Sequence, residues 1–256
     1  MATALAQTDT GELLTPRPPR VCAGAFSPGP ATLPELSAAL SRMSSSRACG
    51  PDGITVHMLR CTFPVIGPHL LKIVNHSIVN CDVPAEWKSA VVTALHKKGD
   101  TSDPNNYRPI SVISVVAKLC ERVVCTQLVD YLVSHHVLCH QQYGFRPGQS
   151  TEAALLDAVT FATDNIDRGM MTSLVTADTS KAFDSVEHGR LLDKLEWYGV
   201  HRDWFSAWLR GRTQTVRGGS CALEVTHGVI QGSIMGPVLF LLYANTCHRT
   251  FHMGKL

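Results

Sequence analysis

The sequence carries little excess charge of either sign. Its formal net charge is +2 at pH 7, and its pI is about 8.1. Such a balance does not by itself indicate nucleic-acid binding, so any basic surface must come from local clustering of Lys and Arg. No low-complexity tract dominates, and 45% of the 256 residues are hydrophobic. This composition predicts a globular chain with one large or two small domains.

Long apolar runs and export signals are also lacking. The longest apolar run, Val238 to Ala244, is far shorter than the ~20 residues that span a bilayer. The N-terminus has no basic region followed by an apolar stretch, which is the pattern of a secretory signal. We therefore expect no membrane association and an intracellular location, either cytoplasmic or nuclear.

None of the nine cysteines stands at CxxC spacing, and their number is odd. We therefore expect reduced, mostly buried thiols. One group of possible zinc ligands does occur, formed by His135, His136, Cys139 and His140. Because this group follows the end of a predicted helix, we favour incidental surface histidines over a zinc site.

Turn-forming residues and apolar periodicity divide the chain. Residues 1–31 contain five prolines and few large apolar groups, so we expect a flexible tail there. Order should begin near Thr32, which has capping-box spacing to Glu35. Beyond it, helices are expected near residues 33–43, 70–78, 115–132, 153–162, 191–197, 204–209 and 237–243. Strands are expected at residues 90–96 and 173–177, with a hairpin joining 213–217 to 223–226. This order predicts an α+β fold with helices packed on one side of a small antiparallel sheet.

Three segments combine residue types that can carry chemistry. Asp178 follows the β-prone run Ser173 to Ala177. It could hold a divalent metal at a strand end, or merely cap a helix, and the residues alone leave both open. Gln231 and Gly232 precede an apolar helix, and there a simple turn is the favoured interpretation.

The third segment is the charged stretch Ala94 to Ser111. Lys97, Lys98 and Arg108 could converge on a triphosphate, because lysines give compact charge and arginine gives planar bidentate contacts. The alternative is a solvated charged loop.

Taken together, these segments resemble a known family. KKGD with NNYRPIS, QQYGFRPGQSTEAAL, ADTSKAFDSVEH and GVIQGSIMGP occur in the order found in reverse transcriptases of non-LTR retrotransposons. The upstream pieces CGPDGI and VPAEWKSAVV are similar to the same family. The resemblance runs from about residue 44 to residue 245. Several ordered motifs are far more specific than any one of them.

The resemblance implies a right-hand polymerase that copies an RNA template onto a DNA primer from dNTPs. Residues 32–170 would form the fingers with the N-terminal helical part, residues 171–245 a partial palm, and residues 246–256 a divergent tail, with the thumb absent. Asp178 would be catalytic and would bind Mg²⁺ together with the carbonyl oxygen of Thr179. Phe183 would exclude a 2′-hydroxyl. The other dNTP contacts would be Lys97, Lys98, Arg108, Gln231 and Gly232, and Arg146 would lie near the template.

The Tyr-x-Asp-Asp motif of this family is lacking. No aspartate follows Asp203, and Glu224 is the only later acid. Ile230 stands where the family usually has proline, which should loosen the turn there. We therefore expect a C-terminally truncated polymerase domain, inactive alone, whose palm sheet has an unpaired edge on the strand carrying Asp178. The alternative is a remnant that binds nucleic acid or a partner without catalysis.

Overall fold

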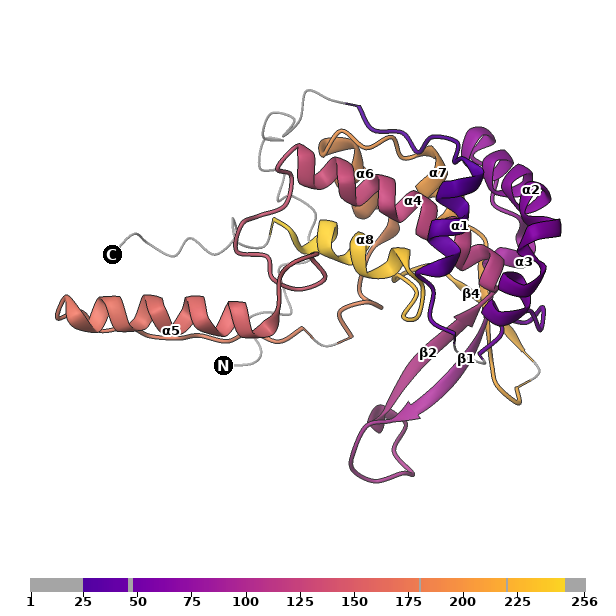
Figure 1. Ribbon diagram of the computed structural model, residues 1–256. Coiled ribbons are helices and arrows are strands. Elements are labelled where there is room, and N and C mark those ends of the chain that lie inside the picture. The colour runs from indigo at the N-terminus through magenta and orange to yellow at the C-terminus, as the bar shows by residue number, and fades with distance from the viewer. Residues whose placement is uncertain (1–24, 46–47, 180, 220, 247–256) are drawn as a thin grey trace.

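The computed structural model describes residues 25–45, 48–179, 181–219 and 221–246 (Figure 1). The predicted tail therefore lies mostly outside the described residues, as does the predicted divergent tail apart from Thr246. Residues 25–31 differ from the expectation. Phe26 pairs with the segment at Val200, and its ring lies 5.2 Å from the ring of Tyr131. Order thus begins before Thr32.

The described chain is α+β, as predicted. Its helices are α1 Leu33–Ser41, α2 Val56–Asn80, α3 Ala85–Lys88, α4 Val115–Ser134, α5 Thr151–Asp167, α6 His188–Trp197, α7 Asp203–Leu209 and α8 Met235–Ala244, with a 3₁₀ turn at Pro104–Asn106. Its strands are β1 Ser89–His96, β2 Tyr107–Ile113, β3 Arg212–Val216 and β4 Ala222–Val225. The capping box at Thr32 and Glu35 forms as predicted and starts α1.

The sheet has the strand order β2-β1-β3-β4. The β1–β2 and β3–β4 pairs are antiparallel, but β1 and β3 are parallel, with Ser89 opposite Thr213. The predicted antiparallel sheet is therefore wrong, and the sheet is mixed. The difference arises because β3 returns to β1 only after four intervening helices, a long connection that permits parallel pairing.

Strand β2 lies mostly in the charged stretch Ala94 to Ser111, where the sequence predicts no strand beyond His96. It pairs with β1 from Ala90 opposite Ile113 to His96 opposite Tyr107, and Pro109 lies within it. Proline is tolerated because β2 is at the edge of the sheet, where one side of the strand needs no partner. The paired strands project from the body as a long hairpin (Figure 1).

The predicted strand Ser173 to Ala177 does not form. The segment is irregular and exposed, with Leu174 79% and Val175 85% exposed. Strand propensity reflects packing on a half-buried pleated surface, and no described strand lies beside this segment. The predicted sheet edge carrying Asp178 is therefore wrong as well.

Helix α4 forms the centre of the core. Leu119, Leu128 and Leu132 on this helix are fully buried, and α1, α2 and α8 contact it. Figure 1 shows these helices grouped on one side of the hairpin, whereas α5 extends away from the body. No side chain of α5 is buried.

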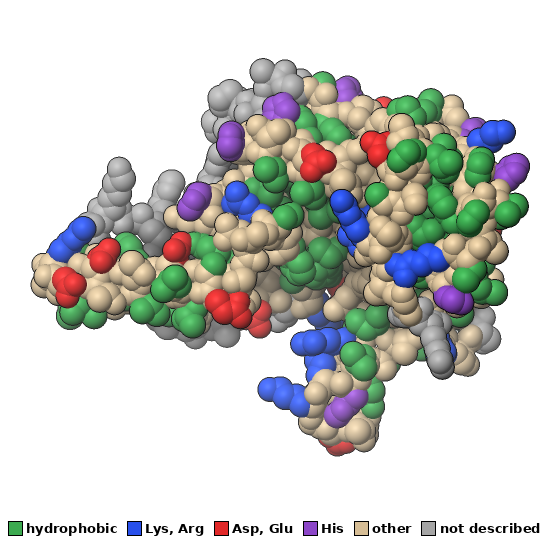
Figure 2. All heavy atoms as spheres, in the orientation of Figure 1, with side chains coloured by type: hydrophobic (Ala, Val, Ile, Leu, Met, Phe, Trp, Pro, Cys, Tyr) green, Lys and Arg blue, Asp and Glu red, His purple; other side chains and the backbone are tan. Residues whose placement is uncertain are grey.

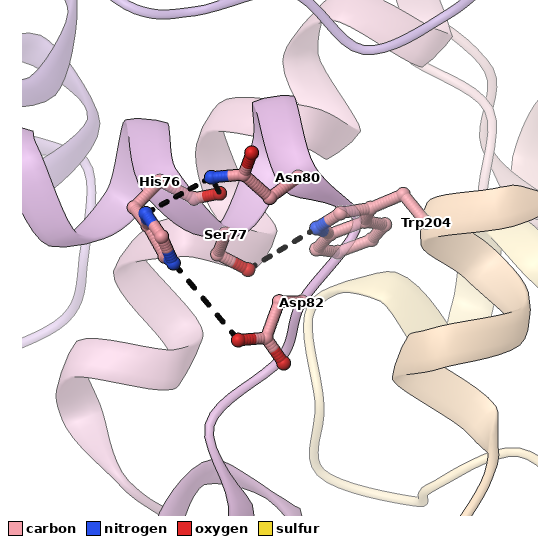
Figure 3. Close-up of polar contacts among 5 residues, drawn as sticks. All are labelled: His76, Ser77, Asn80, Asp82 and Trp204. Carbon is pink, nitrogen blue, oxygen red and sulfur yellow. Dashed lines mark hydrogen bonds and ion pairs between the residues drawn. The ribbon is translucent and has the colours of Figure 1, made fainter.

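The C-terminal end of α2 is tied to α7 by a polar contact (Figure 3). Trp204 Nε1 donates to Ser77 Oγ over 3.4 Å, and both residues are buried. The neighbouring pair of His76 and Asp82 is 4.0 Å apart and largely exposed, so it contributes little to stability. The buried contact and the indole packing therefore join the two helices.

Two further sequence expectations can be compared with the structure. No helix in the described ranges has the length and apolarity needed to cross a membrane. Of the described cysteines, only Cys120 and Cys125 are buried, whereas Cys61 and Cys221 are exposed and Cys49, Cys81 and Cys139 are intermediate. The expectation of mostly buried thiols is therefore wrong, because most of these cysteines lie on loops or on outward faces of helices.

Candidate active site

A cavity of about 790 Å³ lies between the β1–β2 hairpin and the body of the molecule. Its wall on the hairpin includes Lys97, Tyr107 and Arg108, and its wall on the body includes Phe183 and Gln231. Its volume is in the range of small-molecule sites, which is roughly 300–1,000 Å³. Residues from three distant stretches of sequence thus face one cavity.

Positive charge reaches this cavity from both walls, because Lys181 on the body lines it together with basic residues of the hairpin. The basic residues of the hairpin are Lys97, Lys98 and Arg108, and Figure 2 shows Lys and Arg side chains gathered on this projection. Lys97 N donates to Asn106 O over 2.8 Å and closes the hairpin. Tyr107 Oη donates to Thr101 O over 2.8 Å, which holds the connecting loop. Lys97 and Arg108 line the cavity and Lys98 does not.

Phe183 is held between two other aromatic rings. It stacks on Phe240 of α8, with 4.9 Å between centroids and 16° between planes. The ring of Phe145 meets it edge-on at 5.8 Å. Stacked and edge-on pairs of this kind are favourable geometries for aromatic rings, so the ring of Phe183 has a fixed orientation at the cavity wall.

Backbone hydrogen bonds place Gln231 beside Phe183. Val229 N donates to Phe183 O over 2.9 Å, and Ser111 N of β2 donates to Gln231 O over 2.8 Å. The next residue, Gly232, has φ +121°, and an added Cβ would lie 2.4 Å from Ser111 O. Only glycine allows so close an approach of two backbones in this conformation.

The turn at Ile230 is closed in spite of the missing proline. Ser233 N and Ser233 Oγ each donate to Ile230 O over 3.2 Å. Ile230 itself is buried, with 9% of its surface exposed. These hydrogen bonds and this burial fix the turn without a proline ring.

A buried carboxylate anchors the helix that follows this turn. Glu121 of α4 accepts hydrogen bonds from Ile234 N over 2.7 Å and from Trp208 Nε1 over 3.0 Å. Burial raises the pKa of Glu121, and the neighbouring charge of Arg212 opposes that shift. Burial also lowers the pKa of Arg212 to about 10, so the guanidinium stays charged at neutral pH. Sequence periodicity indicates only the apolar positions of α4 and misses this group.

The other predicted site residues lie elsewhere. Asp178 and Thr179 are exposed and do not line the cavity. Arg146 donates to Cys139 O over 3.1 Å and lines a separate cavity of about 320 Å³. Gly232 lines a small neighbouring cavity. The acid that does face the large cavity is Asp184, one residue after Phe183 in the same sequence motif.

The histidine cluster shows no convergence on a metal. The Nδ1 atom of His135 lies 3.0 Å from Tyr131 O. His136 and His140 line the same cavity as Arg146. Within the described residues, no three His, Cys, Asp or Glu side chains are grouped closely enough to hold an ion.

Comparison with known proteins gives the family. The family described as "Reverse transcriptase (RNA-dependent DNA polymerase)" matches residues 95–254. The "Probable RNA-directed DNA polymerase from transposon BS" of Drosophila melanogaster is 28% identical over 88% of this chain and 26% of its own length.

Two further relatives match the chain with similar identity. The corresponding polymerase from transposon X-element of Drosophila melanogaster is 29% identical over 82% of the chain and 24% of its own length. The Pol polyprotein of the R2 element of Popillia japonica is 28% identical over 75% of the chain and 27% of its own length. The chain thus spans about a quarter of the length of these relatives. It belongs to the reverse transcriptase family, and to the kind found in non-LTR retrotransposons.

Proposed function

We propose that the chain is the nucleotide-binding part of an RNA-directed DNA polymerase, and that the 790 Å³ cavity receives the incoming dNTP. One observation carries this proposal. Lys97, Arg108, Phe183 and Gln231 come from three separate family motifs and line the same cavity. The β1–β2 hairpin would then belong to the fingers, and the segment around Phe183 and Gln231 to the palm.

Each wall of the cavity has a separate role in this proposal. Lys97 and Arg108 bind the triphosphate, because a compact ammonium and a planar guanidinium suit phosphate oxygens. Phe183 lies against the sugar and disfavours a 2′-hydroxyl by steric exclusion. Gln231 offers donor and acceptor groups beside the template base.

Reverse transcriptases generally use a divalent metal ion, and we propose that Asp178 and Thr179 supply part of such a site beside the cavity. Mg²⁺ in polymerases takes about one or two carboxylates together with substrate phosphates. Asp178 and Thr179 are both exposed, so a carboxylate and an adjacent backbone carbonyl are accessible there. We propose both as ligands of Mg²⁺, with the remaining ligands supplied by other groups, because no set of three ligands forms within the described residues.

Nucleotide binding tests the cavity. Isothermal titration with dATP in Mg²⁺ should show binding that Lys97→Met and Arg108→Met each weaken about 10-fold, as expected when a charged hydrogen bond is removed. Lys98→Met is the matched control, because it removes the same charge from the adjacent residue outside the cavity. Equal weakening by Lys97→Met and Lys98→Met would overturn the assignment.

We also propose that these 256 residues do not extend a primer by themselves. Asp178 is the one aspartate that matches the family's metal ligands, and no Tyr-x-Asp-Asp occurs in the sequence. Primer extension on an RNA template with Mg²⁺ should therefore give no product. Extension that Asp178→Asn abolishes would disprove this proposal, whereas salt-dependent RNA binding without incorporation would favour a non-catalytic nucleic-acid-binding role.

A further inference from the structure

A second, smaller cavity adjoins the turn that carries Gln231. Its volume is about 140 Å³, and its wall includes Lys118 and Arg122 of α4 together with Gly232 and Ile234. A water molecule occupies about 30 Å³ in the liquid, so the cavity has room for a phosphate group but not for a nucleotide. Gln231 lines the large cavity and Gly232 lines the small one, so adjacent residues of one turn face both.

The two cations in this cavity are partly buried and lack acidic partners. Lys118 and Arg122 are four residues apart and therefore share one face of α4. Neither belongs to an ion pair within the described residues. The Nε atom of Arg122 is buried and has no hydrogen-bond partner there. A buried donor without a partner costs free energy that a bound acceptor would recover.

The acid that influences Lys118 is already engaged elsewhere. Glu121 influences Lys118 electrostatically, but its carboxylate oxygens accept from Trp208, Ile234 and Met235. Arg212 is a further cation beside Glu121. Cations therefore outnumber carboxylates around this part of α4, and the excess positive charge faces the small cavity.

We propose that the Lys118–Arg122 cavity binds one phosphodiester of the RNA template strand, next to the turn that contacts the incoming nucleotide. The guanidinium of Arg122 can donate from two of its nitrogens to two phosphate oxygens, and Lys118 adds a compact charge. A template base pairs with the incoming nucleotide, so the template strand passes within the width of a base pair of the large cavity. This assignment rests on the proposed polymerase function and adds a template contact to it.

Salt dependence of RNA binding tests the assignment. For single strands, the slope of log K against log salt changes by about 0.7 for each phosphate charge that the protein no longer neutralises. The double variant Lys118→Met with Arg122→Met removes the neutralisation of one phosphodiester, so it should lower the slope by about 0.7 and weaken binding of a fluorescent RNA oligomer roughly 5-fold at about 0.1 M salt. Lys118→Arg with Arg122→Lys keeps both charges and should restore most of the affinity and of the slope.

Matched controls separate this site from general charge effects. Lys72→Met with Arg190→Met also removes two positive charges, from exposed residues outside the cavity, and should change the slope by much less. A control that changes the slope as much as the double variant would overturn the proposal. An unchanged slope in the double variant, with native circular dichroism and thermal unfolding, would also overturn it.

Binding of dATP and competition by inorganic phosphate distinguish a template site from a site for the nucleotide or for free phosphate. Affinity for dATP should be the same in the double variant and the wild-type chain, and millimolar inorganic phosphate should not displace the RNA. Weaker dATP binding in the double variant would assign the cations to the nucleotide's phosphates instead and would contradict the template assignment. Failure of dATP to bind any variant, with the RNA result intact, would contradict the proposed nucleotide cavity alone.

Discussion

At the scale of single residues, the buried acid on α4 is expected to stabilise the fold. Glu121→Gln keeps the shape of the side chain but replaces one acceptor oxygen with a donor, which then faces Trp208 Nε1–H or Ile234 N–H. A buried donor left unpaired costs about 1–3 kcal/mol. We therefore expect the free energy of unfolding in urea at pH 7 to fall by about that amount.

A matched control for this change is Glu187→Gln. Glu187 pairs with Arg190 on the surface, with both side chains well exposed, and such pairs contribute about 0–1 kcal/mol. A decrease at Glu121 no greater than the decrease at Glu187 would show that the buried network does not stabilise the fold.

The cysteines provide a second prediction at this scale. Burial raises the pKa of Cys120 and of Cys125 to about 12, from an ordinary value of 9.0. This lowers the thiolate fraction at pH 8 about 1,000-fold, and the thiolate is the reactive form. Iodoacetamide at pH 8 should therefore modify exposed Cys61 while leaving Cys120 and Cys125 intact until the chain unfolds.

The same shift fixes the direction of a pH effect. Because both thiols keep their protons in the folded state, the unfolded state loses protons first above pH 9. The free energy of unfolding should therefore fall as the pH rises from about 9 toward 12.

For the iodoacetamide experiment, peptide mass spectrometry shows which cysteines are modified. Rapid modification of Cys120 in the native state would contradict the assigned burial.

At the scale of elements, the turn at Gly232 contacts β2 and leads into the helix α8. Gly232→Ala would place a Cβ 2.4 Å from Ser111 O at a φ of +121°. The two backbones must then separate, so we expect the unfolding free energy to fall by about 1–3 kcal/mol and dATP binding to weaken. Gly29→Ala is the control, because no described atom beyond its chain neighbours lies within 4 Å of its added Cβ.

Elements also show how far sequence reasoning reaches. Apolar periodicity predicts helices such as α4 and α8 close to their observed bounds. It misses strand β2, which alternates little and contains Pro109, because only the pairing with β1 makes this segment a strand. The run Ser173 to Ala177 has strand-forming residues but no partner strand in the described part of the chain, so local propensity gives the wrong answer there.

The sequence likewise predicts some residues of the candidate site and misses others. Ordered motifs bring Lys97, Arg108, Phe183 and Gln231 into one hypothesis, and all four side chains line one cavity. The roles of Phe240 and Glu121 depend on contacts across α8 and α4. No spacing within the sequence predicts such contacts, so these residues emerge only from the fold.

At the scale of the whole molecule, α5 is the least supported helix. None of its side chains is buried, and Leu155, Val159 and Phe161 are 66%, 52% and 64% exposed. In contrast, α4 contains many fully buried side chains. Regions with few buried apolar contacts open with small free energies, so amides of α5 should exchange hydrogen much faster than those of α4.

Hydrogen exchange followed by mass spectrometry measures this difference directly. Peptides from residues 151–167 should reach full exchange while peptides from residues 115–134 remain protected. Equal protection of the two helices would contradict this prediction. It would mean that α5 is covered in solution by part of the chain or by a second molecule.

The projecting β1–β2 hairpin has a mechanical consequence. One wall of the nucleotide-sized cavity belongs to this ribbon, whose outer half is exposed, and the other wall belongs to the body around Phe183. Bending of the exposed outer half of the ribbon would change the gap between Arg108 and Phe183. A ligand that contacts both walls would therefore set the width of the cavity.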